Sequence, residues 1–249
     1  MRVNILGTWI DTLTMAETMA QIEEFIAEGR PRRIITANPE LVYRAQTDRK
    51  LQHLLNTADL VTPDGVGIVW AAKALGAPVP ERVTGIDILT AFFPVANRNK
   101  WRVFLLGAAP GVAAQAVSNM HKDYPDIVFA QHHGFFGSGR EEQELVAEIK
   151  RFKPDLLAVG LGAPRQEYWI SEHYLQLETP VEIGVGGSFD VLSGRIKRAP
   201  DWIRRLKLEW FARLIREPKR WKRQLNLPKF VLAVARQRRL SRRNAVDKS

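Results

Sequence analysis

Residues 102–130 read RVFLLGAAPGVAAQAVSNMHKDYPDIVFA, and their pattern gives the clearest indication of the fold class. An apolar run over residues 102–106 leads through a glycine-containing loop into a pattern of helical length over residues 111–124. A second apolar run follows over residues 127–130. Two short strands joined by a helix of this length lie parallel in one sheet, because the helix returns the chain to the edge where it started. The stretch therefore predicts a β-α-β unit.

The same alternation extends in both directions along the chain. Residues 15–27 form an amphipathic pattern that opens with Thr14 and Glu17 at the spacing of a capping box and ends at Gly29. Residues 141–152 form another pattern of helical length. Further short apolar runs, which we expect to be strands, occupy residues 3–6, 33–36, 60–62, 156–159 and 181–185. This order predicts an α/β protein with a mostly parallel sheet covered by helices on both faces.

Composition excludes several classes of protein. The chain has 249 residues, of which 45% are hydrophobic and 26% are charged, as in ordinary globular proteins. It has no cysteine, which excludes a disulfide framework, a thiolate zinc site and a cysteine nucleophile. No stretch of about twenty apolar residues predicts a membrane-spanning helix. The opening MRVNILGTWID becomes acidic too early for a signal peptide, so we expect the protein to stay inside the cell.

Charge divides the chain into two parts. Residues 195–249 contain 19 Lys and Arg against 4 Asp and Glu, whereas residues 1–194 are mildly acidic, with 18 against 23. We therefore expect a body over residues 1–194 and a basic helical appendage over residues 195–249. A basic tail of this kind suits nucleic acid, anionic lipid or a phosphorylated substrate, and composition leaves all three open.

Five loops follow predicted strands and contain small, proline or polar residues. In a parallel sheet such loops meet at one edge, where ligands bind, so one shared site is the simplest interpretation. The loops are TANPE (residues 36–40), TPDG (62–65), GAAPG (107–111), GLGAPRQE (160–167) and GVGGSFD (184–190).

Each loop residue has a structural and a functional interpretation. Asp64 suits an N-cap or turn, or a general base that accepts a proton from a hydroxyl group. Thr36 and Asn38 suit a strand-end hydroxyl and a helix cap before Pro39, or groups that orient a sugar. Gln166 and Glu167 fall in a first helical turn, where a glutamate also complements the helix dipole.

The glycine loops and the histidines carry weaker signals. GAAPG and GVGG allow backbone N–H groups to approach an anion, and tight turns explain them about as well. Neither is a Walker loop or a GxGxxG motif with its acidic residue. His132 and His133 have no third ligand at metal spacing, and no Asp-x-Asp motif occurs. We therefore expect no metal and no cofactor.

The basic tail combines apolar faces with clustered arginines. At 100° per residue Arg213 falls inside an apolar arc, and Arg220 and Arg223 share a face after Pro218. These arginines suit phosphate oxygens, or they are surface cations with buried stems. Residues 229–243 pair an apolar face with dense positive charge, which favours anionic lipid, with RNA as the competing partner. The apolar arc comprises Trp202, Ile203, Leu206, Trp210 and Leu214.

The combination of TANPE, TPDG, GLGAPRQE, GVGGSFDVLSGRIKRAP and LEWFARLIREPKRW resembles the WecG/TagA/CpsF family of bacterial glycosyltransferases over residues 3–225. This resemblance implies a Rossmann-like domain with an appendage that completes the active site at the membrane. It implies an inverting, metal-independent transfer of N-acetylmannosamine from its UDP form to N-acetylglucosaminyl-diphosphoundecaprenol. Relatives that use the uronic acid form keep another donor open.

The resemblance also assigns roles to residues. It implies that Asp64 is the base, that Thr36 contacts substrate beside it, and that Arg82 and Gln166 line the pocket. It implies that the arginines of the appendage, Arg213, Arg220 and Arg223, reach the diphosphate. Further candidate substrate-binding residues are Phe136 and, on the five loops, Asn38, Gly107, Glu167, Gly186, Gly187 and Asp190.

The partners expected on this basis are a UDP-sugar donor, a polyprenyl-diphosphate-linked N-acetylglucosamine acceptor and an anionic membrane surface. Nucleic acid is not expected, because no reading motif or stacking platform accompanies the basic tail. We expect a cytoplasmic protein held at the inner face of a bacterial plasma membrane, and homo-oligomerisation stays open.

Overall fold

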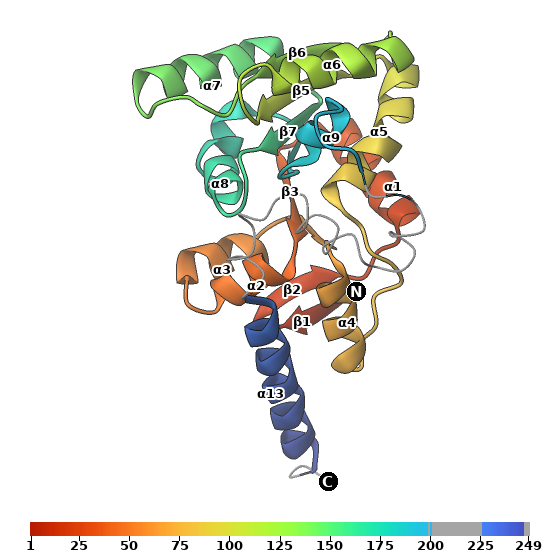
Figure 1. Ribbon diagram of the computed structural model, residues 1–249, viewed down its shortest axis with the longest axis vertical. Coiled ribbons are helices and arrows are strands. Elements are labelled where there is room, and N and C mark those ends of the chain that lie inside the picture. The colour runs from red at the N-terminus through yellow and green to blue at the C-terminus, as the bar shows by residue number, and fades with distance from the viewer. Residues whose placement is uncertain (199, 201–225, 247–249) are drawn as a thin grey trace.

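A computed structural model describes residues 1–198, 200 and 226–246. Its centre is a six-stranded sheet in the order β4-β3-β8-β7-β5-β6, with every neighbouring pair parallel (Figure 1). The predicted α/β architecture with a parallel sheet is therefore confirmed. The strands are β3 (Arg32–Ala37), β4 (Leu60–Pro63), β5 (Arg102–Gly107), β6 (Val128–His132), β7 (Leu156–Gly160) and β8 (Val181–Gly184).

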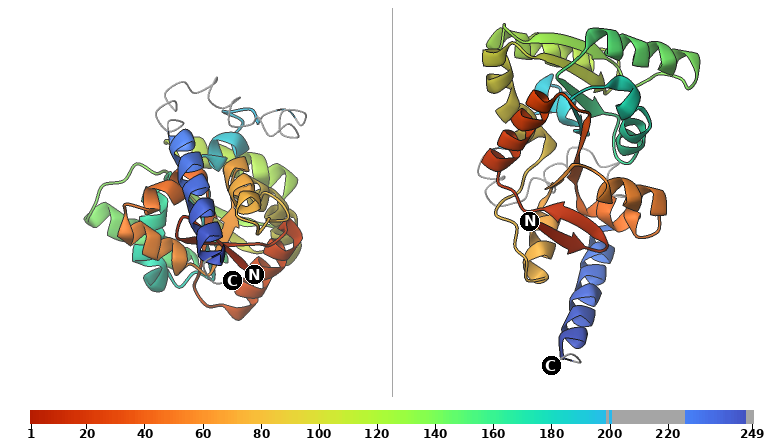
Figure 2. Two further views of the ribbon diagram at one scale, coloured as in Figure 1. Left: turned by 90° about the horizontal axis from the view of Figure 1, so that it is seen from below. Right: turned by 180° about the vertical axis from the view of Figure 1, so that it is seen from behind.

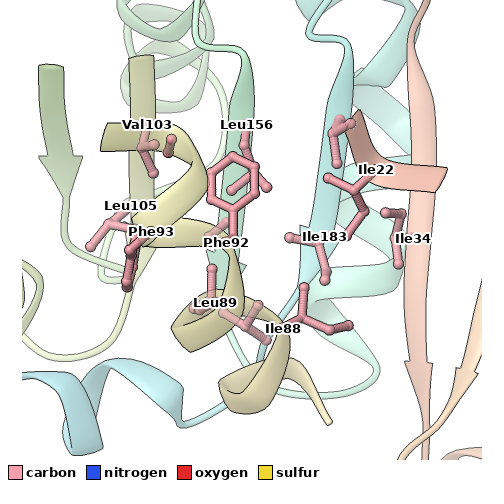
Figure 3. Close-up of a cluster of buried hydrophobic side chains, with 14 of the residues drawn as sticks. Ile22, Ile34, Ile88, Leu89, Phe92, Phe93, Val103, Leu105, Leu156 and Ile183 are labelled. Atoms are coloured by element: carbon pink, nitrogen blue, oxygen red, sulfur yellow. The ribbon is translucent and has the colours of Figure 1, made fainter. Parts of the chain in front are cut away.

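Helices cover both faces of this sheet, because successive buried residues of each strand point to opposite sides. On one face Val103, Leu105 and Ile183 pack against a first set of helices. Figure 3 shows these strand residues beside Ile22, Phe92 and Phe93 of two of those helices. On the other face Phe104 and Ile35 pack against a second set. The first set is α1 (Met15–Glu28), α5 (Gly85–Asn99), α6 (Val112–Asp123) and α9 (Ser188–Leu192). The second set is α2 (Pro39–Ala45), α3 (Arg49–Asn56), α4 (Val66–Ala74), α7 (Arg140–Phe152) and α8 (Arg165–Leu177).

Local signals place the helix ends as predicted. Thr14 caps α1, and its side chain and that of Glu17 form the reciprocal capping box. Gly29 ends the helix with a left-handed φ of 66°. These short-range preferences act before any tertiary contact, which is why sequence reveals them.

The expectation that residues 3–6 belong to the parallel sheet is wrong. They lie in β1 (Arg2–Ile5), which pairs antiparallel with β2 (Thr8–Asp11) in a separate two-stranded sheet. Leu6 and Gly7, both at positive φ, turn the chain directly back on itself. A strand that re-pairs through a two-residue turn has no crossover helix, so it does not follow the β-α-β rule.

The helix α13 (Asn226–Val246) packs against α2 and α4 and then runs away from the sheet (Figures 1 and 2). Phe230 and Val234 are completely buried in the core that these helices share. The side chain of Gln237 bonds to the first hairpin, accepting from the N–H of Leu6 at 2.9 Å and donating to the carbonyl of Asn4 at 3.0 Å. Within the described residues, no helix is both long enough and apolar enough to cross a membrane.

The chain leaves the neighbouring parallel strands β3 and β8 in opposite directions. It passes from β3 into α2 on one face of the sheet and from β8 into α9 on the opposite face. Diverging loops at the carboxyl ends of such strands are the usual ligand position in open α/β sheets. The TANPE and GVGGSFD loops therefore lie side by side at this position.

Candidate functional site

The strand ends that carry Thr36 and Asp64 lie side by side. β3 and β4 pair with Thr36 opposite Thr62, and the N–H of Asp64 donates to the carbonyl of Ala37 at 2.9 Å. Within the described residues, α4 takes Gly65 as its N-cap and has no side-chain capping bond. Asp64 is half-buried at this edge and directly precedes Gly65, the N-cap of α4.

Thr36 is buried, and its hydroxyl group donates to the carbonyl of Gly184 at 2.9 Å. The bond crosses from β3 to the end of β8, so it joins two loops of the predicted site. This bond uses the only hydroxyl proton of Thr36. Toward any further partner the Thr36 oxygen therefore acts as a hydrogen-bond acceptor, through its lone pairs.

Asn38 has the capping role that its position suggests. Its side-chain oxygen accepts from the N–H of Leu41 at 3.0 Å, and Pro39 occupies the start of α2. The site therefore places the N-terminus of α2 directly after Thr36, with its partial positive charge at the edge of the sheet.

Gln166 and Glu167 lie in the first turn of α8, as predicted, and both side chains are buried. The Gln166 amide oxygen accepts from the N–H of Gly186 at 3.0 Å, and its nitrogen donates to Glu167 at 2.9 Å. Burial raises the pKa of Glu167 to about 7, which the bond from Gln166 opposes only in part. The β8 loop and α8 are thus joined through the side chain of Gln166, which Glu167 holds in turn.

Arg82 lies beside the same edge through the segment that leads into α5. Val83 bonds to β4 in both directions, accepting from the hydroxyl of Thr62 at 3.1 Å and donating to the carbonyl of Pro63 at 3.0 Å. The guanidinium of Arg82 pairs with Asp87 at 4.0 Å, and Arg198 pairs with the same carboxylate.

Asp87 and Arg198 are site neighbours that sequence reasoning missed. Thr84 and Asp87 stand three residues apart and bond through the Thr84 hydroxyl at 2.6 Å, a capping signal visible in the segment ERVTGID. Arg198 lies within GRIKRAP, where nothing in the local pattern distinguishes it from the cations beside it. Its pairing with Asp87 joins residues 111 positions apart, which no local pattern reveals.

Among the predicted glycines, Gly107 permits a close contact between two strand ends, and Gly186 adopts a left-handed conformation. A Cβ on Gly107 would lie 2.5 Å from the carbonyl of Gly160, and Gly186 has a φ of 54°. Gly187 is the N-cap of α9, and Asp190 lies in the first turn of that short helix, where its carbonyl accepts from Ile196 at 2.9 Å.

Phe136 lies apart from Thr36 and Asp64, after β6. Its ring packs edge-on against His132 and Trp169, with centroids 6.2 and 6.4 Å away, and the guanidinium of Arg165 lies over it at 5.1 Å. Phe136 packs against the apolar cluster that β5, β7, α7 and α8 form.

The structure brings together one group of predicted residues and leaves others outside it. The loops of β3, β4 and β8 and the start of α8 are joined by hydrogen bonds, which gathers Thr36, Asn38, Asp64, Gln166 and Gly186. Arg213, Arg220 and Arg223, together with the apolar arc around Trp202, lie outside the described residues. In the described part of the chain, no cluster of three or more His, Asp or Glu side chains is arranged to hold a metal ion.

This arrangement can do a limited set of things chemically. A carboxylate at a strand end can take a proton, and helix N-termini and arginines can stabilise a negatively charged leaving group. The diverging loops after β3 and β8 are the position at which open α/β sheets bind their ligands.

Comparison with known proteins identifies the family of the chain. The profile of the "Glycosyl transferase WecG/TagA/CpsF family" matches residues 3–244. A protein of Staphylococcus aureus (strain MW2), named N-acetylglucosaminyldiphosphoundecaprenol N-acetyl-beta-D-mannosaminyltransferase, is 39% identical over 240 residues, which cover 96% of this chain and 94% of that protein. A Bacillus spizizenii (strain W23) protein of the same name is 38% identical over 208 residues, which cover 84% and 80% respectively. The chain belongs to the WecG/TagA/CpsF family of glycosyltransferases.

Proposed function

We propose that this protein transfers N-acetylmannosamine from UDP-N-acetylmannosamine to N-acetylglucosaminyl-diphosphoundecaprenol. The observation that carries the proposal is similarity along nearly the whole chain to relatives named for this transfer. The product would be the disaccharide linkage unit of wall teichoic acid or of a related surface polymer.

In the proposed mechanism Asp64 is the general base. It takes the proton from the acceptor hydroxyl as that oxygen attacks the anomeric carbon of the donor sugar, and UDP leaves from the opposite side. One displacement inverts the anomeric centre. The position of Asp64 at the end of β4, with its backbone bonded to Ala37, supports this role because it places the carboxylate at the carboxyl edge.

Thr36 and Gln166 would orient the sugars beside that base. The hydroxyl proton of Thr36 is held by Gly184, so Thr36 would accept a hydrogen bond from a sugar hydroxyl rather than donate one. Asn38, Phe136, Glu167 and Asp190 are further candidates for substrate contact, as are Gly107, Gly186 and Gly187 of the neighbouring loops.

The diphosphates need positive charge. Arg82, at the entrance to α5, and the N-terminus of α2 would offset the charge of departing UDP. We assign the same task on the acceptor diphosphate to Arg213, Arg220 and Arg223. Paired N–H donors of arginine match phosphate oxygens.

Residues 195–249 would act as an appendage that meets the membrane. The exposed part of α13 carries Leu232 and Leu240 next to a dense set of cations. Exposed apolar side chains with surrounding positive charge favour binding to an anionic leaflet. The cations are Lys229, Arg236, Arg238, Arg239 and Arg243. We place the protein at the inner face of the plasma membrane on this basis.

The test is release of UDP from UDP-N-acetylmannosamine, with and without a short-chain analogue of N-acetylglucosaminyl-diphospholipid, in EDTA. We expect release that depends on the acceptor and persists in the chelator. If UDP is released only from another donor, such as the uronic acid form, the protein uses that donor in place of UDP-N-acetylmannosamine. Release that ignores the acceptor would contradict the assigned reaction.

A further inference from the structure

The pair Gln166 and Glu167 is unusual because two adjacent polar side chains are buried at the same time. Each is only 3% exposed in the first turn of α8. Burying a carboxyl group costs free energy unless hydrogen bonds or an opposite charge compensate for the lost contact with water. Within the described residues, one oxygen of Glu167 accepts from Gln166 and the other has no hydrogen-bond partner.

The two hydrogen bonds of Gln166 depend on which way its amide faces. Its oxygen accepts from the backbone N–H of Gly186 at 3.0 Å, and its nitrogen donates to Glu167 at 2.9 Å. A flipped amide would place its N–H₂ group against the N–H of Gly186 and its oxygen against the carboxyl group. The N–H of Gly186 and the acceptor oxygen of Glu167 therefore favour the same orientation of the Gln166 amide, and Glu167 adds to its stability.

The amide also packs tightly on the end of β8. A Cβ on Gly184 would lie 2.6 Å from the Gln166 side-chain nitrogen, so the backbone approaches this amide closely. The carbonyl of the same Gly184 accepts the hydroxyl proton of Thr36 at 2.9 Å. One continuous path thus runs from Glu167 through Gln166 and the loop after β8 to Thr36.

We propose that Glu167 is a positioning residue: by fixing the amide of Gln166 it holds the loop over residues 184–187, and with it Thr36, in the geometry that binds substrate. This inference rests on the proposed transfer, and it changes the expectation for Glu167 from a substrate contact to a support beneath the site. Burial also raises the pKa of Glu167 to about 7, in agreement with a carboxyl group shielded from water.

The experiment compares E167Q with E167L, because glutamine keeps an oxygen for the Gln166 amide and leucine does not. Amide hydrogen exchange at Gly186, followed by NMR, measures the loop without any turnover. We expect exchange at least about tenfold faster in E167L and in Q166L, and a rate within about threefold of the native protein in E167Q.

Activity supplies the second measurement. E167L should lose about tenfold or more in kcat, E167Q should restore most of that loss, and the double variant Q166L/E167L should be no worse than Q166L alone. E182Q, which changes a buried glutamate away from the path, serves as the matched control and should keep native exchange at Gly186.

Several outcomes would overturn the proposal. An E167Q variant with a native Gly186 exchange rate but little turnover would show that the carboxylate itself acts on the substrate. Independent, multiplying losses in the double variant would separate Glu167 from Gln166. If E167L does not fold, E167Q still decides between these alternatives. If the native protein releases no UDP from UDP-N-acetylmannosamine, the proposed function fails on its own, while the exchange measurement still tests Glu167.

Discussion

Glu167 and Glu182 are both buried, yet they lie in different parts of the sheet and have different neighbours. Glu167 lies at the carboxyl edge, where Gln166 bonds to it. Glu182 lies within β8, completely buried, opposite Arg33 of β3, and neither of its oxygens has a hydrogen-bond partner among the described residues. Burial raises the pKa of Glu182 well above its ordinary value, and the charge of Arg33 only partly opposes this.

The comparison shows that buried polar groups have different roles inside the sheet and at its carboxyl edge. Arg33 is held by structural contacts: it donates to the carbonyl of Thr57 at 2.7 Å and lies over the ring of Tyr174 at 4.4 Å. At the carboxyl edge, the side chains of Thr36 and Gln166 instead hold the loop that follows β8. Buried charge away from the edge should therefore affect stability, and buried polar groups at the edge should affect turnover.

The largest expected effect is on Asp64. D64N should lower kcat by about 100- to 10,000-fold, because a general base contributes a factor of this size. UDP binding, measured by calorimetry, should change little. The matched control is D59N at the opposite end of β4, where Asp59 accepts from the backbone N–H of Arg33 at 2.8 Å. D59N should lose stability but keep turnover within about threefold. Equal losses of kcat in D64N and D59N would contradict the role of Asp64 as the base.

Removal of the buried ring of Phe230 should reduce stability strongly. F230A should lower the free energy of unfolding by about 3–5 kcal/mol, because it leaves a cavity between α13, α2 and α4. Urea denaturation at pH 7 measures this. Leu232 lies on the same helix but is 71% exposed, so L232A should change stability by about 0.5 kcal/mol or less. Similar losses in both variants would mean that α13 does not dock as described.

The buried glutamates should make stability depend on pH. Because the folded protein raises the pKa of Glu167 from 4.5 to about 7, the stability contribution is fully present below about pH 4.5 and falls as pH rises to about 7. The loss is on the order of 3 kcal/mol. E167Q should lack this decline in a series of urea denaturations between pH 4.5 and 7.5. E182Q should remove a separate decline that also begins near pH 4.5, and unchanged pH profiles in both variants would show that neither carboxyl group is desolvated.

The smallest effect should distinguish two hydroxyl groups in the same row of the sheet. Thr36 and Thr62 are paired across β3 and β4, and each donates to a carbonyl, of Gly184 and Val83 respectively. T36V and T62V should each cost about 1 kcal/mol of stability, the ordinary value of one hydrogen bond. Only T36V should also lower turnover by about tenfold. Equal turnover in the two variants would remove Thr36 from the substrate site.

Sequence predicts the parts of the fold that local chemistry controls. The capping box at Thr14, the left-handed glycine at position 29 and Asn38 before Pro39 act over three or four residues, so their signals are complete within the sequence. The expectation that residues 3–6 join the parallel sheet is wrong because the residues of a strand do not indicate which other strand it pairs with. Thr8–Asp11 lies only two residues beyond β1 and is missed for the same reason.

The candidate site is predictable to the level of its loops. Strand ends of a parallel sheet share one edge, so the order of the elements along the chain is enough to place TANPE, TPDG and GVGGSFD together. The bonds between the loops are not predictable, because Gln166 meets Gly186 and Asp87 meets Arg198 only after packing brings distant segments together. The role of Asp64 as base and the positions of Arg213, Arg220 and Arg223 stay predictions.

The docking of α13 has a consequence for the order in which the protein forms. Gln237 satisfies the N–H of Leu6, a residue that leaves the ribosome 231 positions earlier. Until α13 is synthesised, the hairpin lacks that bond, and α2 and α4 expose the apolar surface that Phe230 and Val234 later cover. Such long-range closure comes late and slowly, because the chain between must already be compact. The β1–β2 hairpin, although synthesised before α13, is therefore among the last parts of the fold to be completed, and until then the apolar surface of α2 and α4 is open to chaperones and to other chains.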